Sequence, residues 1–240
     1  MRTLVLQLTI LLLLSGCLKR DESHVNVPCT GECMTFNIVV ATGLNSTVPL
    51  ANAAVKLGWS RPATPIGDAG RLIASGTTDS NGFVSFAFKA REKELQGGQF
   101  YVRAKKGDAY FEQDNSYFGI SQPDSVVNVK VHVPSKAIVK IVYKNFVPTS
   151  DSDYFSCGGY FSTYGSSPLG VRMKTNSGNP ADPFFLGKDT SFVSLELNGT
   201  TAGDQYTYLN IIRKKSGNRV DSRDSIYIGN GETKTYEVAF

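Results

Sequence analysis

Apolar residues alternate with polar ones along most of the chain, and this period of two constrains the fold more than any other feature. In "SVVNVKVHV", Val127, Val129, Val131 and Val133 would share one face, and the polar residues between them the other. Successive side chains of a strand point to opposite sides of a sheet, so the pattern predicts strands with one buried face. No run of helical or heptad periodicity competes with it.

Turn-forming residues separate the alternating segments at short intervals. The clearest example is Asp79-Ser80-Asn81-Gly82, which joins "RLIASGTT" to "FVSFAF". Asn-Gly between two alternating runs is typical of a hairpin, because glycine adopts a positive φ without steric cost. The chain has 240 residues, enough for two domains of about 100 each. We therefore expect an all-β fold of two tandem antiparallel β-sandwiches.

The first of these sandwiches, expected at residues 34–133, resembles a known family. Its segments "VPLANAAVKLGW", "GRLIASGTTDSNGFVSFAF" and "QFYVRAKKGDAYF" are similar, in this order, to the transthyretin-like or carboxypeptidase regulatory-like module of immunoglobulin type. The resemblance implies an Ig-like β-sandwich. It brings no catalytic residues with it, since the chain ends in "TYEVAF" and lacks the Tyr-Arg-Gly-Ser ending of the hydrolases with a transthyretin-like fold.

Pro134 marks the expected boundary, because proline cannot continue the hydrogen-bond ladder of the preceding strand. A second alternating series begins with Ala137, Val139 and Ile141. We expect a second β-sandwich at residues 134–240, interrupted by a loose segment rich in Gly, Pro, Ser and Asn at residues 165–190. This half shows no family resemblance, and no internal repeat relates it to the first half.

An apolar run from Leu4 to Leu14 ends at Ser15-Gly16-Cys17. The run is shorter than the roughly 20 residues that span a bilayer, whereas its basic start, apolar centre and small-residue exit are those of a secretory signal peptide. Leu14 to Cys17 resembles the lipobox of bacterial lipoproteins. The resemblance implies that residues 1–16 are removed and that Cys17 carries diacylglycerol and a further acyl chain such as palmitate. The alternative is an ordinary signal peptide with a chance cysteine.

Residues 17–33 are then expected to form a lipidated tether. Two or more acyl chains hold a protein stably at a membrane, whereas one holds it marginally. No aspartate follows Cys17, so the familiar cue for inner-membrane retention is absent, and Lys19 to Glu22 resemble the charged signal with which some Gram-negative lipoproteins reach the cell surface. We expect a lipid-anchored protein of the cell envelope, at the outer membrane, with exposure on the cell surface as a second hypothesis.

Three cysteines follow the lipobox, which fits an oxidising compartment. Cys29 and Cys33 flank Thr30-Gly31-Glu32, a segment that can turn and bring the two sulfurs within disulfide reach. This pair is the expected disulfide, and a bridge from either one to Cys157 is the alternative. A structural zinc site needs four ligands, and the chain has only two histidines to complete one.

The charge balance argues against a polyanionic partner. Lys and Arg number 25 against 21 Asp and Glu, a net charge of +4, and removal of residues 1–16 with their single arginine lowers it to +3, or 24 against 21. The basic residues are scattered, and the densest group, Arg213-Lys214-Lys215, lies beside a turn signal. We therefore expect no nucleic-acid partner.

The sequence shows no combination of residues that is typical of a catalytic site. A nucleophilic site needs Ser or Cys beside a histidine held by a carboxylate, but His24 lies in the tether and His132 on the polar face of a strand. The carboxylate pair Asp151 and Asp153 falls in a turn-like segment, where we expect both to be solvated. The sequence predicts no enzyme, no cofactor and no metal site, with a hydrolase as the minor alternative.

The segment "DYFSCGGYFSTYG" carries the candidate binding residues. Strand parity puts Tyr154, Tyr160 and Tyr164 on the face opposite the core, unless the glycine pair between them inserts a bulge. Tyrosine combines an apolar ring with a polar tip, which suits stacking on sugar rings or contact with a protein. Tyr206 and Tyr208 share this parity in "QYTYLN" and extend the platform if the two strands are neighbours. The alternative is that the rings pack at the edge of the core.

Two functional hypotheses remain, and fold alone does not choose between them. The first is a non-catalytic binding module for a glycan or an envelope protein, for which we expect exposed aromatic side chains on rigid strands. The second is a structural, assembly or spacer subunit of a surface complex, for which we expect polar outer faces and a stiff joint between the domains.

Overall fold

The computed structural model describes residues 26, 28–61, 69–161, 171–172, 174–175 and 184–240. Strands dominate these residues, and helix is limited to α2 (Glu92–Leu95) and the 3-10 turns η1 (Leu44–Ser46) and η2 (Lys188–Thr190). No helix in this part of the chain has the length and apolarity to cross a bilayer. The expected signal peptide, Cys17, Tyr164 and most of segment 165–190 lie outside the described residues.

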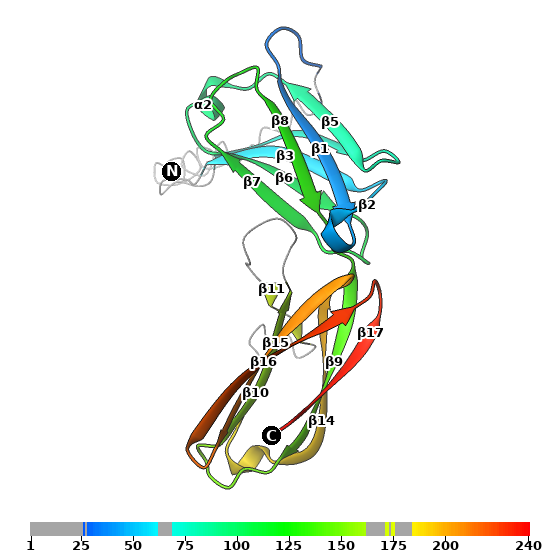
Figure 1. Cartoon of the computed structure of the whole chain (residues 1–240). Helices are drawn as coiled ribbons and strands as arrows, with labels where there is room; N and C mark the ends of the chain where they lie inside the picture. The colour runs from blue at the N-terminus through cyan, green and yellow to red at the C-terminus, as the bar shows by residue number, and fades with distance from the viewer. Residues whose placement is uncertain (1–25, 27, 62–68, 162–170, 173, 176–183) are drawn as a thin grey trace, which may run out of the picture.

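The first sandwich consists of two sheets (Figure 1). In one sheet, β1 (Met34–Thr42) lies between β8 (Val126–His132) on one side and β5 (Phe83–Phe88) with the short β2 (Val48–Pro49) on the other. The second sheet has the order β4 (Ala69–Thr77), β3 (Ala54–Arg61), β6 (Gln99–Lys105) and β7 (Gln113–Phe118). The facing sides bury a core that includes Phe36, Trp59 and Phe100.

The second sandwich is built in the same way. One sheet has the order β12 (Lys174–Thr175), β14 (Phe192–Ala202), β9 (Lys136–Phe146) and β17 (Thr233–Ala239). The other has β10 (Tyr154–Phe161), β15 (Gln205–Lys215) and β16 (Asn218–Ile228), with β11 (Val171–Arg172) and β13 (Phe184–Leu186) on the far side of β10. Its core includes Tyr143, Phe146 and Phe155. The all-β fold of two tandem sandwiches is thus confirmed.

The two sandwiches share one strand connectivity, a relation that the sequence does not show. In each, the first strand pairs in parallel with the last: β1 with β8, and β9 with β17. In the opposite sheet, β3, β6 and β7 of the first sandwich correspond to β10, β15 and β16 of the second. The parallel pairs were not expected. They arise because no tight hairpin joins first and last strands, so their relative direction is set by the crossing of the chain between sheets.

The valines at the end of the first sandwich face the core as expected, whereas the orientation expected for His132 in β8 is wrong. Val129, Val131 and Val133 are buried. His132, expected on a polar outer face, is only 7% exposed because η1 folds over the end of the sheet, and its Nδ1 lies 2.9 Å from the equally covered hydroxyl of Ser46. Burial, and next the charge of Lys130, lower the pKa of His132 to about 4.

A short, hydrogen-bonded joint connects the two sandwiches. The carbonyl of Pro134 accepts from the N–H of Phe111, in the loop between β6 and β7, at 2.9 Å. The carbonyl of Ser135 accepts from the N–H of Gly203, in the loop between β14 and β15, at 2.8 Å. The connecting residues are therefore held by a loop of each sandwich, which is the stiff joint expected of a spacer.

Asp153 is not solvated, contrary to expectation. Its side chain is fully buried and accepts from the backbone N–H of Thr149 at 2.8 Å, of Ser216 at 2.8 Å and of Ser150 at 3.2 Å. Burial by itself raises the pKa of this carboxyl, but the hydrogen bonds together lower it below its usual value. Asp153 is a structural carboxylate that ties the turn after β9 to the turn between β15 and β16.

We expect Asp153→Ala to lower the melting temperature by several degrees, because three backbone N–H groups lose their acceptor at once. Asp151→Ala is the matched control, since Asp151 lies in the same turn but is exposed. Thermal unfolding followed by circular dichroism measures both. Equal melting temperatures for the two variants would contradict the structural role of Asp153.

Candidate functional site

Three of the candidate tyrosines, Tyr154, Tyr206 and Tyr208, lie on the outer face of one sheet in the second sandwich. β10 and β15 are adjacent, which is the condition under which Tyr206 and Tyr208 extend the platform. Their register runs without a break from Tyr154 to Phe161, so the glycine pair inserts no bulge, and Tyr160 is directly opposite Tyr208. Tyr160 is placed here by its backbone register alone.

We call the outward side chains Tyr154, Phe184, Tyr206, Tyr208 and Tyr227 the aromatic face. Phe184, Tyr206, Tyr208 and Tyr227 are 56%, 49%, 39% and 37% exposed, whereas Tyr154 is half-buried. The rings of Tyr154 and Phe184 stack with centroids 6.0 Å apart, and those of Tyr206 and Tyr227 meet edge to face at 5.5 Å. The face therefore holds two ring pairs, with Tyr208 between them along the sheet.

The opposite side of the same strands is core, which fixes the backbone that carries the aromatic face. Phe155, Cys157, Leu209 and Ile211 are buried. The hydroxyl of Tyr143 donates to the carbonyl of Cys157 at 2.9 Å, which joins the two sheets across the core. The exposed rings thus stand on strands whose positions depend on buried packing and not on the rings themselves.

Polar side chains border the aromatic face along β16. Arg219 and Asp221 form an ion pair, with Nε to Oδ1 at 2.8 Å, and the hydrogen bonds and charge of this pair lower the pKa of Asp221. Arg223 is opposite Asn210 in the register. Rings next to fixed amide, guanidinium and carboxylate groups suit the recognition of a ligand with both apolar and hydroxyl-bearing surfaces.

Two members of the aromatic face were missed by sequence reasoning. Tyr227 lies between Ile226 and Ile228, so the alternation in "DSIYIG" was a usable signal for an outward ring. Phe184 and Phe185 are consecutive, and only the pairing of β13 with β10 shows that Phe184 points outward while Phe185 packs on the core.

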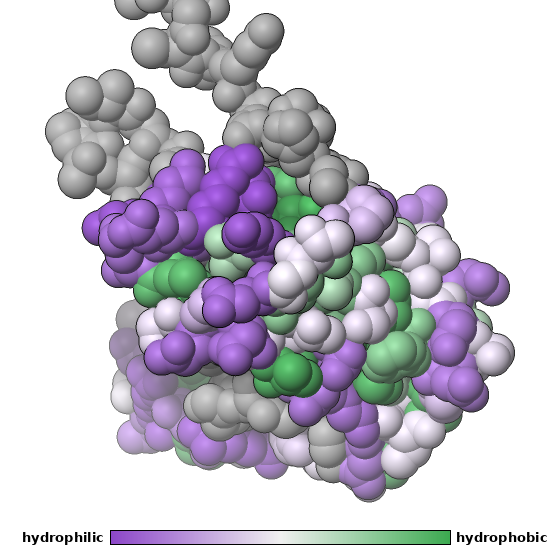
Figure 2. Space-filling view, turned by 90° about the horizontal axis from the view of Figure 1, so that it is seen from above, coloured by the Kyte–Doolittle hydropathy of each residue, from purple (hydrophilic) through white to green (hydrophobic). Residues whose placement is uncertain are grey.

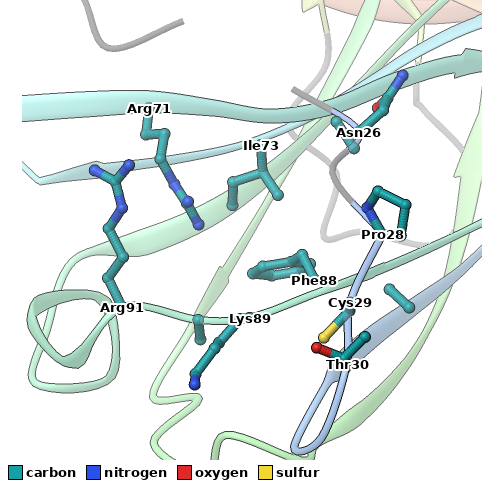
Figure 3. Close-up of a pocket in the computed structure, with 12 residues that line it drawn as sticks. Asn26, Pro28, Cys29, Thr30, Arg71, Ile73, Phe88, Lys89 and Arg91 are labelled. Atoms are coloured by element: carbon teal, nitrogen blue, oxygen red, sulfur yellow. The ribbon is translucent and has the colours of Figure 1, made fainter. Parts of the chain in front are cut away.

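A separate cavity of about 530 Å³ opens on the first sandwich, between β4 and the segment that follows β5 (Figure 3). Ile73 and Phe88 line it, and so do the cationic side chains of Arg71, Lys89 and Arg91, and none of the described residues in its wall is acidic. Arg71 is paired with the completely buried carboxylate of Glu94 at 2.8 Å, so its charge is balanced from inside the sandwich.

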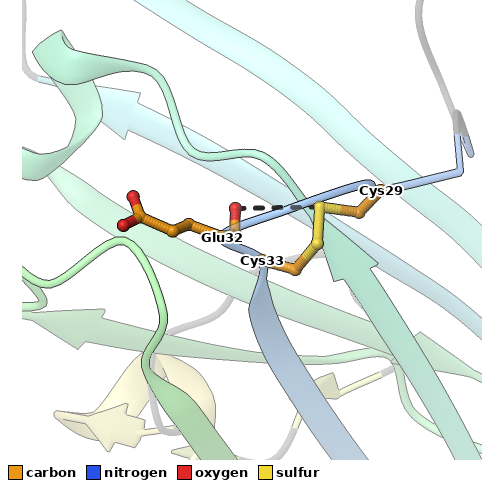
Figure 4. The surroundings of a disulfide bond; sticks show 3 residues. All are labelled: Cys29, Glu32 and Cys33. Carbon is orange, nitrogen blue, oxygen red and sulfur yellow. Dashed lines mark hydrogen bonds between the residues drawn. A yellow bond between two sulfur atoms is a disulfide. The ribbon is translucent and has the colours of Figure 1, made fainter.

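The part of the tether that the structure describes, Asn26 and residues 28–33, lines one side of this cavity and is held by a disulfide and by hydrogen bonds to β4. Cys29 and Cys33 form a disulfide with Cα atoms 6.0 Å apart (Figure 4). The dashed contact of 3.9 Å between Sγ of Cys29 and the carbonyl oxygen of Glu32 is not a hydrogen bond, because a disulfide sulfur carries no hydrogen. Asn26 binds the backbone of β4. Its Nδ2 donates to the carbonyl oxygen of Ser75 at 2.8 Å, and its Oδ1 accepts from the N–H of Ser75 at 2.9 Å.

Among the residues that the structure describes, the remaining chemistry-bearing groups form no accessible reactive site. Ser46 and His132 are in contact but buried. Within the described residues, no three His, Cys, Asp or Glu side chains are grouped so as to hold a metal ion. Seen from above in Figure 2, hydrophilic residues cover much of the surface and the apolar patches between them are small and separate.

No protein-family model matches the chain, and no curated protein matches it. Among solved structures, the TIE protein of Bacillus anthracis is 13% identical over 86% of this chain and 34% of its own, with a TM-score of 0.34. BcpA, the major pilin subunit of Bacillus cereus, is 11% identical over 80% of this chain and 67% of its own, with a TM-score of 0.29.

The shaft pilin SpaA of Lactobacillus rhamnosus GG is 12% identical, covers 88% of this chain and 98% of its own, and has a TM-score of 0.30. This chain spans about a third of the length of the TIE protein. At identities and TM-scores this low, the likenesses carry no argument about function, which must be built from the chain's own residues.

Proposed function

We propose that the chain is a non-catalytic, lipid-anchored protein of the cell envelope whose second sandwich binds a glycan through the aromatic face. The observation that carries the proposal is the gathering of exposed rings from β13, β15 and β16 on one outer face. The lipobox and tether supply the anchor at Cys17, and the mature chain begins there.

The aromatic face suits a sugar for two reasons. Exposed tyrosine rings offer flat apolar surfaces on which the C–H faces of a pyranose can stack, while their hydroxyls stay in water. Asn210, Arg223 and the Arg219–Asp221 pair provide donors and acceptors within the same sheet for sugar hydroxyls. Most of these groups are held on strands, so little conformational entropy is lost on binding.

The first sandwich supports a spacer role beside this binding role. Its outer face over β1 carries a polar row in which Asn37 Nδ2 donates to Asn128 Oδ1 at 3.1 Å and Ser85 donates to Asn37 at 2.9 Å. The joint at Pro134-Ser135 is short and hydrogen-bonded to both sandwiches. The first sandwich would therefore hold the second at a fixed distance from the tether, as Figure 1 suggests by their order.

The glycan proposal is tested with the double variant Tyr206→Ala/Tyr208→Ala. Each ring contributes about 1 kcal/mol to stacking, so we expect affinity for a retained glycan to fall about 10- to 100-fold. Binding to a panel of bacterial envelope polysaccharides is measured by calorimetry. The melting temperature should stay unchanged, since both side chains are exposed.

Phe118→Ala is the matched control, because Phe118 is an aromatic residue that is 72% exposed and lies on β7 of the first sandwich, outside the sheet that carries the aromatic face. It should bind like the wild type. Failure of the wild-type protein to retain any polysaccharide, together with capture of an envelope protein that the double variant loses, would replace the glycan by a protein partner.

A further inference from the structure

β16 (Asn218–Ile228) is a long edge strand. Within the described residues it pairs with β15 alone, and its eight residues from Asn218 to Ser225 are all exposed. Both faces of this stretch are therefore in solvent. An edge of this length offers a row of backbone N–H and C=O groups to another strand.

The turn before β16 determines which backbone groups face outward. Ser216 and Gly217 have φ of 50° and 84° and form a two-residue turn between the paired Lys215 and Asn218. The residues that flank such a turn exchange hydrogen bonds, and the ladder then alternates. The N–H and C=O groups of Arg219, Asp221, Arg223 and Ser225 consequently point away from β15, toward the open edge. The N–H of Ser225 already donates to Oδ1 of Asp224 at 2.7 Å, so pairing with another strand rests mainly on Arg219, Asp221 and Arg223.

We propose that two copies of the chain associate through β16, which pairs antiparallel with itself about a two-fold axis at Ser222. This register joins residues 218–226 of the two copies. It places Asp221 opposite the second copy's Arg223 and, by symmetry, Arg223 opposite the second copy's Asp221. The backbone N–H and C=O groups of these paired residues point toward each other, so backbone hydrogen bonding and charge pairing favour the same register.

The charges select this register over its neighbours. A two-fold axis at Asp221 would bring Asp221 against itself and Arg219 against the second copy's Arg223. An axis at Arg223 would bring Arg223 against itself. Like charges directly opposite one another destabilise a strand pair, so both of these registers are disfavoured. An axis at Val220 would also bring Arg219 opposite the second copy's Asp221, but it joins only residues 218–222 because β16 begins at Asn218. The axis at Ser222 satisfies the charges over the longer stretch.

Charged residues on an edge often serve to prevent pairing. Charges of one sign would do so in every register. Here the outward residues alternate in sign along the strand, as Arg219, Asp221 and Arg223, and are complementary to themselves when the strand is reversed. The pairing also sets the aromatic faces of two copies side by side on one continuous sheet, which would allow bivalent binding.

Cysteine crosslinking tests the axis directly on the full chain. In Ser222→Cys the two new thiols would face each other across the axis in a pair with Cβ atoms about 4.5–5.5 Å apart, within reach of a disulfide after small adjustment. We expect mild oxidation with diamide to give a covalent dimer on non-reducing electrophoresis. Ser225→Cys is the matched control, since its two copies would lie about 20 Å apart. Equal crosslinking of both variants, or of neither, would overturn the proposal.

A charge exchange tests the register independently. By sedimentation equilibrium, we expect Asp221→Arg and Arg223→Asp each to weaken dimerisation at least about ten-fold, because each places like charges opposite one another twice. The double variant Asp221→Arg/Arg223→Asp restores the complementarity and should recover most of the association. A wild-type chain that stays monomeric at 100 μM, about the highest practical concentration, or a double variant as weak as the single ones, would overturn the inference.

Discussion

Replacing Cys17 by Ser is expected to abolish lipid anchoring altogether. A serine hydroxyl cannot form the thioether through which a lipobox cysteine receives its diacylglyceryl group, so the variant either is released unanchored or remains an uncleaved precursor. Each buried lipid CH₂ contributes about 0.8 kcal/mol, and the loss of two or three acyl chains removes the whole of that attraction. Fractionation of cells into membrane and soluble parts measures the effect.

Ser15→Ala is the control for this experiment, because it keeps a small residue before Cys17 and should be lipidated like the wild type. The mass of the N-terminal peptide decides the chemistry. An unmodified Cys17 at the start of the wild-type mature chain, or a Cys17→Ser variant that is cleaved before residue 17 and still membrane-bound, would show that the resemblance to a lipobox is misleading.

The sequence predicts those parts of the fold that are determined locally. In the turn between β4 and β5, the carboxylate of Asp79 accepts from the N–H of Asn81 at 2.9 Å and of Phe83 at 2.8 Å. Gly82 has φ of 71°, and a Cβ there would collide with the carbonyl oxygen of Val40. Apart from the contact with Val40, these requirements lie within five consecutive residues, so the turn could be predicted from the sequence. The hairpin expected there is wrong, because β4 pairs with β3 and β5 pairs with β1, in opposite sheets of the sandwich.

Features that depend on distant residues could not be read in this way. The parallel pairing of Thr35 with Val126 joins residues that are far apart in the chain. The burial of Asp153 depends partly on Ser216, which is 63 positions away. Local sequence patterns do not contain such contacts, and Asp153 was therefore assigned to solvent on the turn-like composition of its segment.

The candidate site shows the same division. Parity correctly places Tyr206 and Tyr208 outward, because alternation within one strand fixes the face of each side chain. Whether β10 and β15 are neighbours is a property of the whole sandwich, and only the structure supplies it. Phe184 joins the aromatic face through the pairing of a three-residue strand, too short for any periodic signal.

Acidification from pH 6.5 to pH 4 is expected to destabilise the first sandwich by about 3 kcal/mol through His132 alone. An unfolded histidine has a pKa of about 6.5, whereas burial, together with the charge of Lys130, lowers the pKa of His132 in the folded chain to about 4. Between these values the unfolded chain binds a proton that the folded chain excludes. Stability is therefore complete above pH 6.5 and falls as the pH drops toward 4.

The fluorescence of Trp59 reports this loss of stability in the first sandwich. It is the single tryptophan of the chain and is buried in the same core as Val131, beside His132. Urea unfolding followed by its fluorescence should give midpoints that decrease from pH 7 to pH 4. In His132→Gln the side chain has no charge at any of these pH values, so the variant should lose most of this decrease, although its stability at pH 7 is lower. Equal pH dependence in the variant and the wild type would show that His132 takes up its proton without cost and that the cover formed by η1 and Ser46 is open in solution.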